Sequence, residues 1–248
     1  MAALTMPTLR SRLARVPVTT VLVVLVVLVS LAGLFWPAFE ALLERDPALI
    51  LHGQWWRLLT QLFVQKHGWS QFVFNIVGLA LLGVVVELRM RRAVVLLTFL
   101  AAGVGSALLL GILQPHLVDA GTSDSVAGFV GLLTVYSFRR SPAESLPVVP
   151  FAYSAFFAVY LTAIDLLPVA YAIIVGSALT GILTSVRLVG NPRAAVMSLF
   201  ATVVAATVVL CAERDGHGFG LAIGLIIGLA AAQGSKGAVS RREEPSRP

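Results

Sequence analysis

VTTVLVVLVVLVSLAGLFW, residues 18–36, decides the fold class of this chain. No charged side chain interrupts it, and about 20 apolar helical residues cross the hydrocarbon layer of a bilayer. Arg10, Arg12 and Arg15 precede the stretch, as in a signal peptide. The stretch exceeds the roughly 7–15 apolar residues of a signal peptide, and no convincing small-residue cleavage site follows. We therefore expect a retained first membrane span.

The composition of the whole chain leads to the same class. Of 248 residues, 58% are hydrophobic and only 12% are charged, whereas about a quarter are charged in a soluble domain. The isoelectric point of about 10.2 is basic, but the basic residues form short clusters between apolar runs rather than a patch. That pattern is typical of membrane topology and does not indicate nucleic-acid binding. The lone Cys211 has no partner for an internal disulfide and no metal-ligand spacing.

Eight apolar segments are long enough to be considered as spans. Asp165 and Pro168 separate the fifth from the sixth, which are a tight hairpin or one disturbed segment, and Gly190-Asn191-Pro192 marks a break before the seventh. The sequence thus predicts an all-α, polytopic transmembrane bundle. The segments are approximately 18–38, 69–88, 92–113, 122–138, 146–164, 167–186, 194–212 and 216–233.

Charge between these segments predicts the orientation. With the N-terminus inside, every inner segment is basic, and most acidic residues fall outside, as the positive-inside rule requires. We therefore expect cytoplasmic termini on an integral protein of the plasma membrane. The expected regions are a cytoplasmic segment 1–17, a transmembrane domain 18–233 and a disordered cytoplasmic tail 234–248. The outer loop 39–68 is rich in Trp, Leu and Phe, so we expect it to lie on the bilayer.

Strongly polar side chains occur inside three of the predicted spans. Because such groups are costly in a bilayer, they are functional candidates. The predicted topology gives the second, fourth and eighth spans the same direction, so these side chains share one depth near the outer surface. The residues are Gln71, Asn75, Ser123, Asp124 and His217.

Together these residues indicate acyl-transfer chemistry. A serine hydroxyl is a weak nucleophile until a base takes its proton, and His217 can act as that base for Ser123. Amide groups of Gln71 and Asn75, with backbone N–H groups near Ser123, can hold an oxyanion. A Ser–His dyad without a carboxylate is workable, because the third member of a triad mainly orients the base. No metal or other cofactor is implied.

Each of these residues also has a simpler interpretation. Ser123 at a helix start is typical of an N-cap, and a lone His217 at a membrane interface is typical of a structural residue. Asn75 is typical of a side chain that joins transmembrane helices. His67 reads as an ordinary interfacial residue of the outer loop. Only the set as a whole favours catalysis over these interpretations.

Four segments, in order along the chain, resemble the rhomboid family of intramembrane serine proteases. They carry a Trp-Arg loop motif, a helix with Asn and an ending of Gly-x-x-x-Glu, a serine motif similar to Gly-x-Ser-Gly-x-x-x-Gly, and a helix similar to His-x-x-Gly-x-x-x-Gly. The segments are GQWWRLLT at 53–60, FVFN at 72–75 with Gly83 and Glu87, GTSDSVAGFVG at 121–131, and HGFG at 217–220 with Gly224 and Gly228.

The resemblance implies an intramembrane serine endopeptidase. Ser123 and His217 would be its catalytic residues, Asn75 and Gln71 would bind the oxyanion, and its partners would be membrane-protein substrates in the bilayer. The glycines of the serine and histidine helices form smooth faces that let two helices approach closely. The resemblance identifies neither a substrate nor an oligomeric state.

The sequence departs from the family pattern in three places. Gln71 stands where the family has His, and Asp124 stands where it has Gly after the nucleophile. Three predicted spans, rather than one, separate Ser123 from His217. If the sixth span, 167–186, were the counterpart of the family's histidine helix, the site would lack its base. The alternatives are a catalytically inactive rhomboid-like protein that binds membrane helices, and an unrelated bundle such as a transporter.

Overall fold

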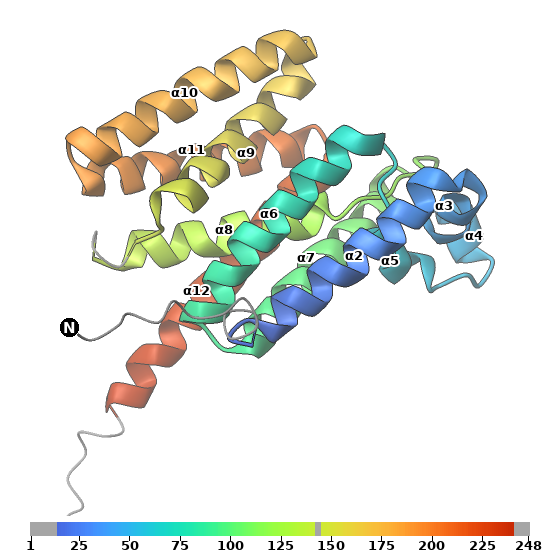
Figure 1. The fold of residues 1–248 in the computed structure, drawn as a ribbon, viewed down its shortest axis with the longest axis horizontal. Coiled ribbons are helices and arrows are strands. Elements are labelled where there is room, and N and C mark those ends of the chain that lie inside the picture. Colours follow the sequence, from blue (N-terminus) through green and yellow to red (C-terminus); the bar gives the residue numbers. More distant parts are fainter. Residues whose placement is uncertain (1–13, 142–144, 241–248) are drawn as a thin grey trace, which may run out of the picture.

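A computed structural model describes residues 14–141 and 145–240, and within them it is built of helices without a strand (Figure 1). Eight long helices correspond one to one to the eight predicted spans, which confirms the all-α bundle. They are α2 (Pro17–Phe35), α6 (Gly68–Arg89), α7 (Arg92–Leu113), α8 (Ser123–Arg139), α9 (Val148–Leu166), α10 (Val169–Val189), α11 (Pro192–Ala212) and α12 (Gly216–Ser240).

Six of these helices are long and apolar enough to cross a membrane. The other two are α8, which has 17 residues, and α12, whose apolar part is Gly216–Ala231. The fifth and sixth segments are two separate helices, α9 and α10. α12 continues through the first residues of the predicted tail, to Ser240, while residues 1–13 of the predicted N-terminal segment and 241–248 of the tail lie outside the described residues.

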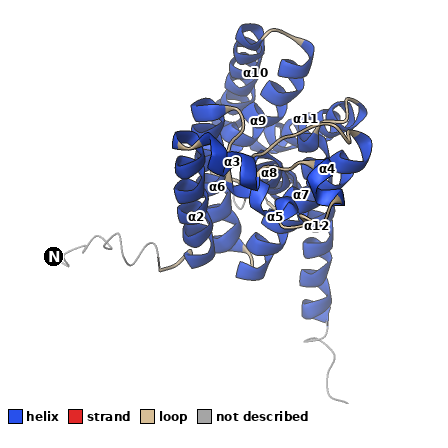
Figure 2. Ribbon diagram, turned by 90° about the vertical axis from the view of Figure 1, so that its right-hand side faces the viewer, coloured by secondary structure: helices blue, strands red, loops and turns tan. Residues whose placement is uncertain are grey.

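The predicted outer loop folds into short helices at one end of the bundle, on the right in Figure 1; this end faces the viewer in Figure 2. Prolines occupy the first position of α3 and α4, where their missing N–H has no helical partner to lose. The elements are α3 (Pro37–Leu43), α4 (Pro47–Leu51), α5 (Arg57–Thr60) and the 3-10 helix η1 (Gln61–Phe63).

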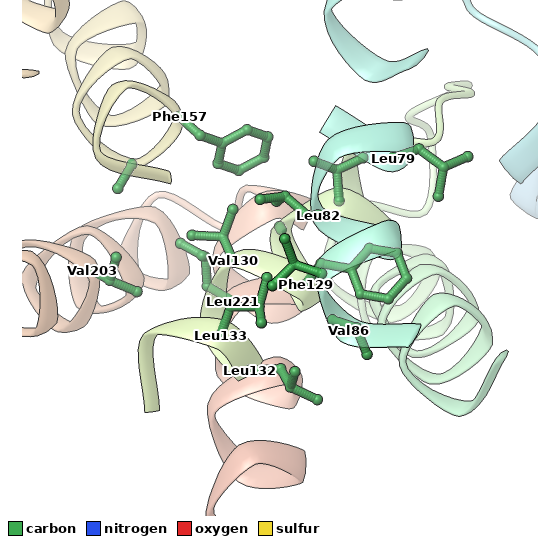
Figure 3. Close-up of a cluster of buried hydrophobic side chains, with 14 of the residues drawn as sticks. Leu79, Leu82, Val86, Phe129, Val130, Leu132, Leu133, Phe157, Val203 and Leu221 are labelled. Atoms are coloured by element: carbon green, nitrogen blue, oxygen red, sulfur yellow. The ribbon is translucent and has the colours of Figure 1, made fainter. Parts of the chain in front are cut away.

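The centre of the bundle is α8, which is buried over most of its length. Phe129, Leu132 and Leu133 are fully buried among side chains from α6, α9, α11 and α12 (Figure 3). α8 is flanked by α7 and α6, and α12 packs along it. The helix that begins with Ser123 is therefore held rigidly by packing on several sides.

Glycines allow α12 to lie directly against α8. A methyl group built on Gly220 would overlap the backbone of Asp124, and one on Gly224 would overlap the carbonyl of Gly128. A methyl group on Gly228 would lie 2.9 Å from Val135 Cβ. These contacts advance along both helices in the same sense, so α8 and α12 are parallel and their N-terminal ends meet. The small-residue stripe predicted from the sequence thus joins the serine helix to the histidine helix.

The sixth span takes a different place. α10 packs on α9 and α11 and lies at the edge of the bundle in Figure 1. Its Gly176 approaches Phe156 and Tyr160 of α9. It is therefore α12, which carries His217, that lies beside the serine helix.

Helix α6 is joined to helix α2 through a buried carboxylate. Glu87, near the end of α6, accepts hydrogen bonds from the backbone N–H groups of Val18 (3.0 Å) and Thr19 (2.7 Å) in the first turn of α2. Gly83, one turn earlier, leaves room for Thr19, because a methyl group there would lie 2.8 Å from its Cγ2. A carboxylate at a helix N-terminus is favourable for the helix dipole. The Gly-x-x-x-Glu pattern is thus a helix-packing and capping device.

Replacing Glu87 by alanine is expected to lower the free energy of unfolding by about 2–4 kcal/mol, because two backbone donors lose a charged acceptor. Glu87→Gln keeps one acceptor oxygen and is expected to lose less. Thermal unfolding in detergent micelles measures both. An alanine variant as stable as the natural protein would contradict this role.

Candidate active site

The loop between α2 and α6 is held over the bundle by the arginine of the Trp-Arg motif. Arg57 is buried; it donates from Nη1 to the carbonyl oxygens of Ala41 (2.9 Å) and Glu44 (2.8 Å) and from Nε to Gln54 (2.7 Å). A guanidinium suits this task because its donors are fixed in a plane. The motif therefore folds the loop rather than meeting the reacting groups.

Below this loop lies a cavity of about 320 Å³ at the end of the bundle. It is lined by the N-terminal ends of α6, α8 and α12, the C-terminal ends of α7 and α9, and the segment that precedes α8. Polar side chains dominate its lining: Gln61, His67, Gln71, Gln114, Ser123 and the charged residues Arg45, Asp119, Asp124, Asp165, Glu213, Asp215 and His217. Of the four site residues predicted from the sequence, three line this one cavity.

Ser123 is the first residue of α8, not its N-cap. The N-cap is Thr122, whose hydroxyl donates to the carbonyl of Leu62 (2.6 Å). Within the described part of the chain, no hydrogen bond engages the Ser123 hydroxyl, and none links it to His217. The capping interpretation of Ser123 is therefore wrong, and its hydroxyl is free to face a substrate.

Gln71 lies beside the serine, one turn into α6. Its Oε1 accepts from the backbone N–H of His67 (3.0 Å), and its Nε2 donates to the carbonyl of Ala120 (3.2 Å). A methyl group built on Gly121 would lie 2.5 Å from Gln71 Nε2 and 3.2 Å from Ser123 Oγ. The amide and the hydroxyl therefore face the same small space, which the absence of a side chain at Gly121 keeps open.

Asn75 occupies a different position, beneath the cavity rather than in its lining. Its side chain is fully buried, and Nδ2 donates to Gln65 Oε1 (2.8 Å). Gln65 Nε2 donates in turn to the hydroxyls of Thr122 (2.9 Å) and Ser30 (3.2 Å). Asn75 thus belongs to a buried network that ends at the residue before Ser123.

His217 is the second residue of α12, and its ring has two defined neighbours. Nδ1 lies 2.5 Å from Asp215 Oδ1, and the ring meets Phe157 of α9 edge to face, with centroids 6.1 Å apart. The side chains of His217 and Asp215 keep 22% and 24% of their exposure, so the cavity reaches both. Ser123 and His217 come from helices about 90 residues apart in sequence, yet they line one cavity.

Asp124, the departure next to the nucleophile, is directed toward α12. A methyl group built on Gly216 would lie 2.7 Å and 2.9 Å from its two carboxylate oxygens. Gly216 is the first residue of α12, where a negative charge interacts favourably with the helix dipole. The carboxylate thus lies over a helix N-terminus, whereas Gln71 lies on the side of Gly121.

The cavity carries more negative than positive groups. Asp119 pairs with His67 at 3.5 Å, and this hydrogen bond raises the pKa of His67 above its ordinary value despite the opposing effect of burial. Arg45 is 1% exposed, and burial lowers the pKa of its guanidinium. Its backbone pairs with that of Asp119, so the loop and the segment before α8 form one wall of the cavity.

Sequence reasoning missed several residues of this site. His67 read as an ordinary interfacial residue, and neither Arg45 nor Asp215 was a predicted site residue. The one available signal was the spacing Asp215-x-His217, because an aspartate two residues before a histidine at a helix start can reach its ring. Nothing in the sequence pointed to Gln65.

Parts of this chain are similar to known proteins. A family model described as "Rhomboid domain" matches residues 52–191, more than half of the chain. The match includes Gln71, Asn75 and Ser123 and ends before His217. Among curated proteins, the chain is similar to "Rhomboid protease GluP" of Bacillus subtilis (strain 168), at 34% identity over 89 residues. These residues are 36% of this chain but only 17% of that protein, so the chain matches less than a fifth of the relative. No solved structure matches the chain.

Proposed function

The chain belongs to the rhomboid family, and from this premise we propose that it is an intramembrane serine endopeptidase. Its substrates are membrane proteins, which it cleaves within or next to their transmembrane segments. One observation carries the proposal: Ser123, His217 and Gln71, from three different helices, line one polar cavity at the end of an apolar bundle.

Ser123 is the proposed nucleophile and His217 the proposed base. As the Ser123 oxygen bonds to the carbonyl carbon of the scissile peptide, its proton passes to Nε2 of His217. The same nitrogen then gives this proton to the leaving amine as the C–N bond breaks. A water molecule then attacks the acyl carbon in the same way and gives its proton to His217. His217 returns a proton to the Ser123 oxygen as the acyl group is released.

The negative charge on the carbonyl oxygen needs donors. Gln71 Nε2 is the proposed side-chain donor, and the backbone N–H groups in the first turn of α8 are the proposed main-chain donors, because a helix leaves its first N–H groups without helical partners. We assign Asn75, the other predicted oxyanion residue, a supporting task. Through Gln65 and Thr122 it fixes the position from which Ser123 starts α8.

No step of this scheme requires a metal or another cofactor. The Asp124 carboxylate lies against Gly216 at the N-terminus of α12, whereas the Gln71 amide lies against Gly121, so the two groups contact different parts of the cavity wall. This placement favours a working protease over the inactive rhomboid-like protein considered above.

Cleavage of a single-span membrane protein in proteoliposomes tests the proposal. The natural protein is expected to release two fragments, and Ser123→Ala is expected to release none while unfolding at the same temperature. Ser125→Ala is the matched control, because the Ser125 hydroxyl donates to the carbonyl of Phe99 (2.7 Å) inside the bundle. Cleavage that persists in Ser123→Ala would refute the assignment. A folded natural protein that binds such substrates without cutting them would indicate the inactive alternative.

A further inference from the structure

His217 is held by a carboxylate that the dyad scheme does not include. Asp215 Oδ1 lies 2.5 Å from Nδ1 of the ring, and the same oxygen accepts from the backbone N–H of His217 at 2.6 Å. One aspartate therefore contacts both the side chain and the main chain of the proposed base. Both contacts are shorter than a usual hydrogen bond to nitrogen, as expected where the acceptor carries charge.

The turn between α11 and α12 fixes the position of Asp215. Arg214 adopts a left-handed conformation, with φ of 59°, which ends α11 and reverses the chain. The N–H of Asp215 then donates to the carbonyl of Leu210 (2.8 Å), and Gln114 at the end of α7 donates from Nε2 to the carbonyl of Arg214 (2.8 Å). The first bond holds Asp215 and the second holds the preceding residue, so the contact with His217 is made from a turn that is fixed by its neighbours.

The ring of His217 has further neighbours besides Asp215. Phe157 meets it edge to face. Besides Asp215, the titratable and charged groups that line the same cavity as His217 are Asp124, Asp119, His67, Asp165, Glu213 and Arg45. Among the described residues, none of these groups is hydrogen-bonded to the ring; Asp215 is the one that is.

We propose that Asp215 is a positioning residue that completes a Ser123–His217–Asp215 arrangement; this inference rests on the proposed function. With its acceptor at Nδ1, the carboxylate holds the proton of the neutral imidazole on Nδ1 and leaves Nε2 free to take the Ser123 proton. When Nε2 is protonated, Asp215 stabilises the imidazolium without taking its proton. The proton on Nε2 then leaves with the amine.

The ionisation of Asp215 agrees with this role. Burial by itself raises the pKa of the carboxyl group, but the charge of His217 and its two hydrogen bonds lower it, and the pKa lies below its ordinary value. Asp215 therefore remains a carboxylate across the neutral range. This is the state in which it can accept a hydrogen bond from Nδ1–H.

A purely structural role must be separated from this one. Asp215 immediately precedes α12, and its bond to the N–H of His217 is that of an N-cap. Asparagine caps helices about as well as aspartate, so Asp215→Asn preserves the cap while removing the charge. Asp215→Ala removes both. Comparing the two variants therefore separates the effect of helix capping from the effect of orienting the base.

The test measures pH–rate profiles for the full chain in proteoliposomes. For Asp215→Asn we expect kcat to fall by about 10²- to 10⁴-fold near neutral pH with an unchanged unfolding temperature. The acid limb of the profile should move to lower pH, because the imidazolium has lost its neighbouring anion. Asp46→Asn is the matched control, because it makes the same exchange at the N-cap of α4 and Asp46 does not line the cavity. Its kcat should stay within about threefold of the natural value, and its acid limb should not move.

The outcomes separate this inference from the proposed function. If cleavage depends on Ser123 but Asp215→Asn keeps the natural kcat and acid limb, the positioning role is refuted and the protease assignment stands. If the natural protein does not cleave, both fall. Nitrogen NMR of the His217 side chain gives a reading besides activity: the proton should reside on Nδ1 in the natural protein and lose this preference in Asp215→Asn. An unchanged tautomer would overturn the inference.

Discussion

Replacing His217 by alanine is expected to lower kcat for peptide-bond cleavage by about 10⁴-fold or more. Without the imidazole, nothing takes the Ser123 proton as the tetrahedral intermediate forms. The substrate KM should change little, because His217 would act on the reacting bond rather than on the substrate's helix. Single-turnover cleavage in proteoliposomes measures the loss over this range.

Two comparisons make this expectation specific. Residues that act as one unit are not additive, so Ser123→Ala combined with His217→Ala should be no slower than either single variant. His67→Ala removes another imidazole from the same cavity and is expected to lose less than about tenfold. A His217→Ala variant that cuts within tenfold of the natural rate would exclude His217 as the base.

Replacing Gly224 by alanine is expected to push α12 away from α8 and so to move His217 away from Ser123. The added methyl group would overlap the carbonyl of Gly128, and because this neighbour is backbone, no side chain can rotate away. Overpacking of cores typically destabilises by about 1–3 kcal/mol, and here we expect the upper end or more. Activity should fall at least about 10²-fold, because small misplacements of reacting groups have effects of that size.

Gly181→Ala is the matched control for Gly224→Ala. Gly181 lies within α10, and no atom lies within 4 Å of the position of a methyl group there. Alanine favours a helix over glycine by about 1 kcal/mol, so this variant should be as stable as the natural protein or slightly more so. Thermal unfolding in micelles, with cleavage measured in parallel, compares the two. Equal behaviour of both variants would contradict the close α8–α12 contact.

The sequence predicted the long helices well because one strong signal governs them. The length of the apolar segments predicted the positions of all eight long helices. The break at Gly190-Asn191-Pro192 agrees with the start of α11 at Pro192. The short helices of the outer loop were not predicted. Their form depends on Arg57, whose hydrogen bonds to distant carbonyls arise only from the folded loop.

The sequence predicted only the part of the site that follows from membrane topology. The common direction of three spans placed Gln71, Ser123 and His217 at one end of the bundle, and they share one cavity. Topology predicts how deep a side chain lies in the membrane, but not the direction in which it points. Asn75 therefore entered the same prediction, although its amide donates to Gln65, a loop residue whose position no periodicity reveals.

Asp215 shows a second limit. Its carboxylate reaches His217 because Arg214 turns the chain through a left-handed conformation. That conformation is uncommon for a residue other than glycine, so no pattern in the sequence predicted it. The cytoplasmic termini, the plasma-membrane location and the boundaries of the transmembrane domain remain predictions from charge and hydropathy.

The most direct measurement of the central claim is the site of covalent labelling by a fluorophosphonate, a reagent that phosphonylates activated serines. The purified natural protein is treated in micelles, digested and analysed by mass spectrometry. We predict one adduct, on Ser123, with labelling lost in Ser123→Ala and strongly slowed in His217→Ala. A folded protein without an adduct, or an adduct on another residue that persists in Ser123→Ala, would contradict the account.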